Sequence, residues 1–368
     1  MILFCVLSCG LYFKKALFVQ RRRLKFVMFC LSSNPGERRM RYLVGDVDEY
    51  DRNVQAIFEI CEDCSLKEDK SKWKRLPRPS SLFVHLDDAP FCGRQTYKMW
   101  RASFDLTSAP FQKTDLNRPK KLHFLPLETF NIGNAKVGNQ TFVQYICGFL
   151  KIFFSGLKVN FNDQFQVENI KPTERRHPVT ERRQFLVTDF YDRLHRVTGI
   201  PRTDYILGLT WTDLYPSKDL NFVLGEASDQ HKSGVFSFGR FEPQTFHRDL
   251  ALDEDAELQL DGDIIWKMLR VATHETCHLF RLKHCVFFSC SMNASSSVTE
   301  AISQPLFLCP VCLRKLQKFL GFDIFKRYQR LLELCELLQG EYPSQNMESG
   351  ITWLRQCLDF LSSMSVNS

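Results

Sequence analysis

The sequence predicts an α/β (α+β) fold, a mixed β-sheet with helices packed on it and a helical C-terminal tail. Short segments of alternating apolar and polar residues are interleaved with longer amphipathic segments between residues 119 and 339, a pattern typical of sheets covered by helices. Hydrophobic residues make up 44% and charged residues 25% of the 368 residues, which is ordinary for a globular protein. A chain of this length can bury a large core.

Composition divides the chain into three parts. Residues 1–118 contain turn-rich stretches such as LPRPSSL and DDAPFCG and predict an irregular or partly helical, poorly defined leader. Residues 119–339 carry the regular elements and form the predicted main domain. Residues 340–368 predict a linker, EYPSQNMESG, followed by a final helix at 351–361.

The first elements of the main domain follow from periodicity. Residues 122–130 alternate like a strand, 141–157 have the length and apolar density of a helix, and LKVNF (157–161) predicts a second strand. Residues 185–197 form an amphipathic pattern that Gly199 closes, as expected just after a helix end.

Further strands are expected within 206–228 and 233–241, before a helix that carries a histidine motif. This helix starts near Asp261 or Asp263, either of which can cap it. Leu313 to Leu338 reads as one long amphipathic helix. The buried side of the histidine helix is formed by apolar residues at helical spacing: Ile264, Ile265, Met268, Leu269 and Ala272.

The histidine helix carries the sequence HETCH, with His274, Glu275 and His278. Residues four apart lie on the same face of a helix, so both imidazoles can face one ion, while Glu275 is placed to reach a water molecule on that ion. This H-E-x-x-H arrangement is typical of sites where two histidines hold Zn²⁺ and a carboxylate acts as general base.

A catalytic zinc ion usually has three protein ligands and one open position. His284 is the obvious third ligand, and it can reach the ion only if the helix ends after His278 and the chain turns back. A downstream carboxylate such as Glu300 is the alternative third ligand.

Four cysteines follow in two pairs, Cys285 with Cys290 and Cys309 with Cys312. Two pairs beside a histidine motif favour a closed zinc site made of cysteines. The alternatives are buried core thiols for the first pair and a redox pair for the second.

With Met292 two positions after Cys290, the stretch from His274 to Cys312 resembles the archaemetzincin branch of the metzincin zinc peptidases. The resemblance covers residues 119 to about 335. It implies a metzincin-like sheet, two zinc ions per chain, and hydrolysis of peptide or protein substrates with narrow or aminopeptidase-like specificity. The residues that it implies are the catalytic zinc ligands His274, His278 and His284, the general base Glu275, the structural zinc ligands Cys285, Cys290, Cys309 and Cys312, and the turn residue Met292.

Arg281 stands where the family pattern has glycine. Glycine ends the helix there in a left-handed conformation, which costs an L-residue with a side chain about 1–2 kcal/mol. If Arg281 displaces His284, the chain is instead a catalytically impaired, zinc-stabilised binding protein. This is the competing hypothesis.

The charge and the cysteine content limit which partners and which cellular compartment can be expected. The net charge is +7, and the basic stretch 171–183 also contains glutamates and prolines, which favours a solvated loop over a nucleic-acid site. Residues 1–13 are too short to span a bilayer, and the charges that follow them do not match a secretory signal, although an organelle-targeting segment is an alternative. Scattered cysteines, read as buried thiols, predict a reducing compartment, the cytoplasm or nucleus. No pattern predicts an oligomeric state.

Overall fold

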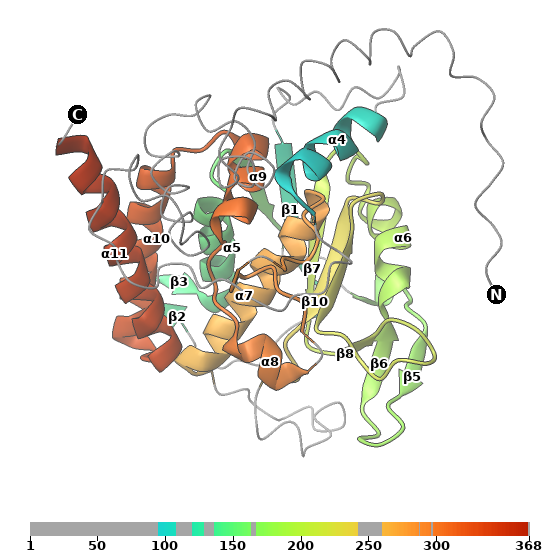
Figure 1. Cartoon of the computed structure of the whole chain (residues 1–368). Coiled ribbons are helices and arrows are strands. Elements are labelled where there is room, and N and C mark those ends of the chain that lie inside the picture. Colours follow the sequence, from blue (N-terminus) through green and yellow to red (C-terminus); the bar gives the residue numbers. More distant parts are fainter. Residues whose placement is uncertain are drawn as a thin grey trace, which may run out of the picture.

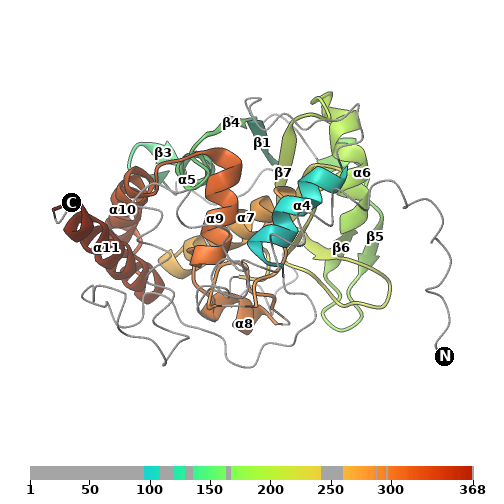
Figure 2. The same cartoon turned by 45° about the horizontal axis from the view of Figure 1, so that its top comes forward.

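The computed structural model describes residues 95–107, 120–128, 136–162, 167–241, 260–286, 288–295 and 297–366. The predictions made for the apolar first residues and for most of the leader lie outside these ranges. Figure 1 shows a central sheet with helices on both sides, and Figure 2 shows the same arrangement from a second direction.

The central sheet has five strands in the order β4-β1-β7-β10-β9. The first four are parallel to their neighbours, and only β9 runs antiparallel, beside β10. The predicted mixed sheet is therefore confirmed. The strands are β4 (Leu157–Phe161), β1 (Lys120–Pro126), β7 (Tyr205–Thr210), β10 (Ser233–Ser237) and β9 (Gly225–Ser228).

Successive residues of each strand point to opposite faces of the sheet, and each face is covered by its own hydrophobic core. Leu207 and Leu209 of β7 join the larger core, and Ile206 of the same strand joins the smaller one. The larger core lies under α5 (Phe142–Phe153) and α7 (Gly262–Leu279), and the smaller one under α6 (Val187–Thr198). Figure 1 shows α6 on the opposite side of the sheet from α5 and α7.

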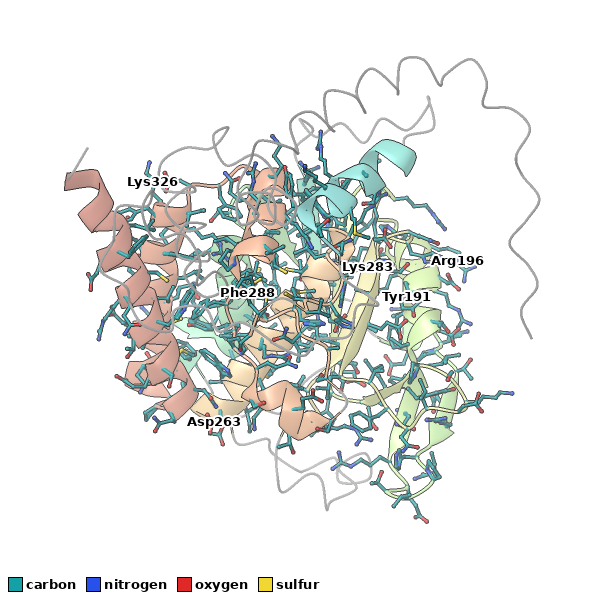
Figure 3. The ribbon with its side chains drawn as sticks, viewed as in Figure 1. Tyr191, Arg196, Asp263, Lys283, Phe288 and Lys326 are labelled. Carbon is teal, nitrogen blue, oxygen red and sulfur yellow. The ribbon has the colours of Figure 1, made fainter. Side chains whose placement is uncertain are left out.

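The caps of two helices agree with the sequence. Asp261 caps α7, because its side chain accepts a hydrogen bond of 2.7 Å from the backbone N–H of Ile264. Gly199 ends α6 with a φ of 67°. In Figure 3, Asp263 marks the start of α7 and Lys283 lies in the loop beyond its end.

The predicted single helix from Leu313 to Leu338 is wrong. It is two helices, α9 (Pro310–Leu320) and α10 (Ile324–Glu341). Gly321 takes a φ of 76° and ends α9, and the side chain of Asp323 caps α10. Apolar residues at helical spacing continue on both sides of the break, so the periodicity alone indicates one helix.

The last helix is longer than predicted. α11 (Gln345–Val366) begins before Ile351, so much of the expected linker is helical. The hydroxyl of Ser344 accepts a hydrogen bond of 3.1 Å from the backbone N–H of Met347, and thus caps the helix. Leu354 and Cys357 of α11 are buried in the larger core.

The basic stretch 171–183 is only partly a loop. Its first half contains β5 (Glu174–Arg176), which pairs antiparallel with β6 (Arg183–Leu186), and β6 pairs with β8 (Asp213–Tyr215). The prediction of a solvated loop is wrong for residues 174–176, which form a strand. The side chain of Arg175 also binds protein groups. Its guanidinium donates to the carbonyls of Ser217, Lys218, Leu220 and Asn221.

The remaining elements are short or peripheral: α4 (Tyr97–Thr107), β2 (Lys136–Val137), β3 (Gln140–Thr141), the 3₁₀ turn η2 (Val167–Asn169) and α8 (Val298–Ser303). Trp100 of α4 is fully buried in the larger core, which also contains residues of α7. The domain limits at 118 and 339 stay predictions. No helix among the described residues has the length and apolar character needed to cross a membrane.

Candidate metal centre and active site

The end of α7 is built as a Schellman motif. The backbone N–H of Leu282 donates to the carbonyl of Cys277 at 3.2 Å, and that of Arg281 donates to the carbonyl of His278 at 2.9 Å. The turn reverses the chain directly after His278. The predicted short loop before His284 is therefore present.

Arg281 occupies the left-handed position of this motif, with a φ of 64°. Its Nη1 donates to the carbonyl of Ser103 at 2.8 Å, its Nε lies 3.3 Å from an oxygen of Asp229, and its guanidinium lies 4.6 Å from the ring centroid of Phe104. A hydrogen bond contributes about 0.5–1.5 kcal/mol net and a partly exposed ion pair up to about 1 kcal/mol. Together these contacts contribute enough free energy to offset the cost of the left-handed conformation, which is about 1–2 kcal/mol.

The three predicted histidines converge. Their ring centroids lie 4.7 Å apart for His274 and His278, 5.3 Å for His274 and His284, and 4.9 Å for His278 and His284. One ring nitrogen from each lies within 4.8 Å of the others. Glu300 is exposed on α8 and does not belong to this group within the described part of the chain.

The hydrogen bonds of two histidines show that their facing nitrogens suit a cation. Nδ1 of His274 lies 2.6 Å from the carbonyl oxygen of Ser291, and Nδ1 of His278 lies 2.6 Å from that of Leu282. A carbonyl only accepts, so each Nδ1 carries a proton and each neutral ring keeps a lone pair on Nε2. These two Nε2 atoms lie 3.0 Å apart. Zinc–nitrogen bonds of about 2.0–2.1 Å place tetrahedral ligands roughly 3.3 Å apart.

The surroundings keep the histidines neutral. Burial, followed by the neighbouring His278, lowers the pKa of His274 well below its ordinary value. Burial and the nearby His284 lower the pKa of His278 to about 4. Burial also lowers the pKa of His284. Neutral imidazoles are the form that binds metal ions.

Glu275 lies next to His274 on α7 and is buried. Its Oε2 has no hydrogen-bond partner among the described residues. Burial, then the charge of Glu226, raises the pKa of Glu275 to about 8, against the opposing effect of Arg270. Gly225 of β9 makes room for it, because a Cβ there would lie 2.8 Å from Cγ of Glu275.

The four predicted cysteines also converge and are buried, and none of them forms a disulfide with a described residue. Their sulfur atoms all lie within 4.8 Å of one another. The Sγ atoms of Cys285 and Cys309 are 3.6 Å apart, close to the roughly 3.8 Å expected for tetrahedral ligands with zinc–sulfur bonds of about 2.3 Å. Cys290 Sγ accepts hydrogen bonds from the backbone N–H groups of Met292 and Cys309.

Sequence reasoning missed Asn293, whose side chain holds together the loop that contains Cys285 and Cys290. Its side-chain nitrogen lies 2.9 Å from the carbonyl oxygens of both Cys285 and Phe288, and its side-chain oxygen accepts from the N–H of Cys290 at 2.7 Å. A single asparagine in a cysteine-rich loop gives no periodic signal. Met292 is fully buried beside it, and its carbonyl accepts from the N–H of Cys285.

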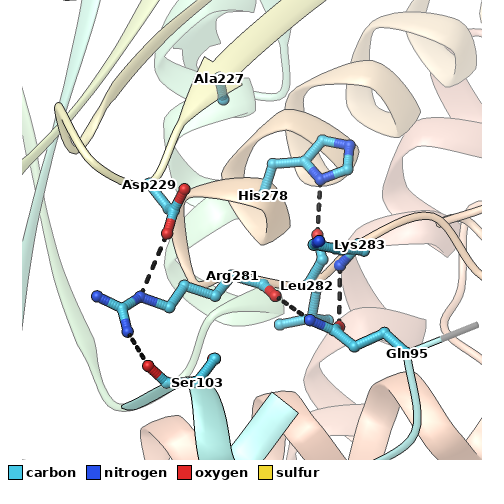
Figure 4. A pocket seen from close by; sticks show the side chains of 8 residues that line it. All are labelled: Gln95, Ser103, Ala227, Asp229, His278, Arg281, Leu282 and Lys283. Atoms are coloured by element: carbon cyan, nitrogen blue, oxygen red, sulfur yellow. Dashed lines mark hydrogen bonds and ion pairs between the residues drawn. The ribbon is translucent and has the colours of Figure 1, made fainter. Parts of the chain in front are cut away.

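A pocket of about 190 Å³ opens beside His278. Figure 4 shows that the end of α7, β9 with the residues after it, and the segment around α4 all contribute side chains to it. The lining residues are Gln95, Ser103, Ala227, Asp229, His278, Arg281, Leu282 and Lys283.

Comparison with known proteins identifies relatives of this region. A model of peptidase family M54 matches residues 169–318, which include both clusters. Archaemetzincin-2 of Rattus norvegicus is 31% identical over 233 residues, or 58% of this chain and 64% of the rat protein. Archaemetzincin-1 of Homo sapiens is 32% identical over 249 residues, or 62% of this chain and 49% of the human protein. The chain thus spans less than two thirds of the length of these two relatives.

Among solved structures, an archaemetzincin from Methanopyrus kandleri matches with a TM-score of 0.39 and 24% sequence identity. The match covers 55% of this chain and 97% of that protein.

Proposed function

We propose that the chain is a zinc-dependent peptidase of the archaemetzincin type. The support is the match of residues 169–318 to the model of peptidase family M54, the similarity to the archaemetzincins, and the geometry of the histidine cluster. The observation that carries the proposal is the pair of facing Nε2 atoms in His274 and His278, with His284 completing the group. Two lone pairs at this distance repel each other, so the arrangement is favourable only around a shared cation. Three imidazoles leave one position open for a water molecule and a substrate.

Each residue of the site has a proposed role. When bound, Zn²⁺ supplies a Lewis acid that polarises a carbonyl group and makes water more acidic. Glu275 is the general base. Its Oε2, which has no hydrogen-bond partner in the part of the chain that the structure describes, accepts the proton of the attacking water. The same carboxyl group then donates this proton to the leaving amine. The carbonyls of Ser291 and Leu282 hold the two helical imidazoles in place.

The cysteine cluster is proposed as a second, structural zinc site. It offers four ligands and no open position, and its sulfur spacing suits a tetrahedral ion. Two zinc ions per chain are therefore expected. Thiols must stay reduced to serve as ligands, and the described cysteines form no disulfide with one another. A reducing compartment such as the cytoplasm or nucleus is therefore also proposed.

An extended peptide is the proposed substrate. β9 is an edge strand of the sheet, and residues in and after it line the pocket beside His278. An edge strand can pair with a peptide backbone and lay it along the site. Asp229 lines this pocket but lies 3.3 Å from Nε of Arg281, which lines it too. Aminopeptidase-like specificity is therefore proposed from the family resemblance alone.

The competing hypothesis of a catalytically impaired binding protein rests on displacement of His284 by Arg281. The contacts of Arg281 with Ser103 and Asp229 count against it, since they stabilise the turn that brings His284 to the cluster. Activity measurements decide between the two.

The test combines metal content with cleavage of a peptide library. The wild-type protein is expected to hold two zinc ions and to cleave peptides, and Glu275→Gln to hold both ions but lose at least about 100-fold in rate. Peptides with free and acetylated amino termini test the specificity. A wild-type protein that holds both ions and cleaves no peptide would support the impaired alternative.

A further inference from the structure

The side chain of Gln95 makes two hydrogen bonds to the backbone of the turn that follows α7. Its Nε2 donates to the carbonyl of Arg281 at 2.9 Å, and its Oε1 accepts from the backbone N–H of Lys283 at 3.0 Å. Figure 4 shows this two-point contact on either side of Leu282. Gln95 is buried, so the amide has little access to water as an alternative partner. The contact fixes the backbone immediately before His284.

Gln95 also binds α9, the helix that contains Cys312 of the other cluster and begins directly after Cys309. Nζ of Lys315 donates to the backbone carbonyl of Gln95 at 2.5 Å and lies 3.1 Å from its Oε1. Lys315 is on α9 and only 2% exposed. One residue therefore joins the loop that carries His284 to the helix that carries Cys312.

α4 adds further contacts to the same turn. The indole N–H of Trp100 donates to the carbonyl of Phe280 at 3.1 Å, and Trp100 is fully buried. The guanidinium of Arg281 reaches the carbonyl of Ser103 near the end of α4. Residues 280, 281 and 283 thus each use a backbone group or side chain to bind the segment 95–107. This segment lies outside the part of the chain that matches the peptidase family model.

We propose that Gln95 is a positioning residue for the histidine site, acting through the turn at residues 281–283 to hold His284 against His274 and His278. This inference rests on the proposed zinc site. Without the amide, the turn loses both of the contacts that Gln95 makes to its backbone, and the third ligand is free to move away from the other two. Removing a partner that orients a metal ligand typically weakens metal binding about 10–100-fold.

The test measures metal affinity at the two clusters separately in the full chain. Cobalt(II) serves as the probe, because thiolate and imidazole sites give different visible spectra, and competition with a chelator gives each affinity. Gln95→Glu keeps the size of the side chain and the acceptor for Lys283, replaces the donor to Arg281 by a carboxylate oxygen, and adds a negative charge beside Lys315. Gln95→Ala removes both contacts. Gln144→Ala is the matched control, since Gln144 also accepts a backbone hydrogen bond but caps α5.

Both Gln95 variants are expected to lose about tenfold or more in affinity at the histidine site, with the affinity of the cysteine site unchanged, and Gln144→Ala to match the wild type. Because no substrate is present, this readout separates positioning from substrate contact. Equal loss at both clusters, or no loss at either, would overturn the inference. A wild-type protein that binds no metal at the histidines refutes the proposed function and this inference together, whereas unchanged affinity in Gln95→Glu and Gln95→Ala refutes the inference alone.

Discussion

Nδ1 of His274 lies 2.6 Å from the carbonyl oxygen of Ser291, a residue directly between Cys290 and Met292. The loop folded by the cysteine cluster therefore supplies the acceptor that orients a ring of the histidine cluster. In addition, His284 and Cys285 are consecutive residues. The histidine site thus depends on the cysteine site for its geometry.

This dependence predicts the effect of Cys290→Ser. The loss of one thiolate is expected to release the structural ion and, by freeing the Ser291 carbonyl, to weaken metal binding at the histidines as well. Zinc content per chain should fall from two to fewer than one. Cys147→Ser, which alters a buried cysteine of α5 far along the sequence from both clusters, should keep both ions. If Cys290→Ser keeps one tightly bound ion and full activity, the two sites are independent.

The third ligand can be identified by metal content. His284→Ala is expected to hold one zinc ion and to lose peptidase activity, because two imidazoles bind zinc weakly. Lys283→Ala and Glu300→Ala should hold two ions, since Lys283 contributes its backbone to the turn and Glu300 lies outside the cluster. The opposite pattern, with loss in Glu300→Ala and none in His284→Ala, would make the carboxylate the ligand.

Two substitutions at Arg281 separate the backbone from the side chain. Arg281→Ala keeps the cost of the left-handed conformation and loses the contacts with Ser103, Asp229 and Phe104. Arg281→Gly loses the same contacts but removes the backbone cost. Glycine is therefore expected to be more stable than alanine by about 1–2 kcal/mol in urea unfolding of the zinc-loaded protein. Equal stability of the two variants would mean that the turn relaxes when the arginine is removed.

A substitution at Gly225 is expected to leave zinc binding intact and to lower peptidase activity. In Gly225→Ala the new methyl group would lie 2.8 Å from Cγ of Glu275 and 2.9 Å from Cβ of Phe236. Glu275 is buried and has to shift, and a displacement of about 1 Å can cost about 100-fold in rate. Zinc content should be unchanged. Gly340→Ala, where a Cβ meets nothing within 4 Å, is the control, and equal activity of the two variants would show that Glu275 adapts.

The ligands of both clusters could be predicted from sequence because local rules place them. Helical periodicity brings His274 and His278 together, and Asp261 marks the helix start. The contacts that support them could not be predicted, because they join distant positions. Gln95 and Arg281 are 186 residues apart, and neither belongs to a pattern that points to the other. The break at Gly321 was missed for a different reason, since a single glycine within an apolar periodicity competes with many residues that favour a continuous helix.

The place of β1 between β4 and β7 has a practical consequence. Residues 169–318, the part matched by the peptidase family model, contain the ligands of both clusters but neither β1 nor β4. A recombinant fragment limited to this range would expose the edge of β7, whose residues after Tyr205 are all buried in the whole chain, and an exposed apolar strand edge promotes aggregation. Production of the protein for metal and activity assays therefore requires the upstream strands, although they contribute no ligand to either cluster.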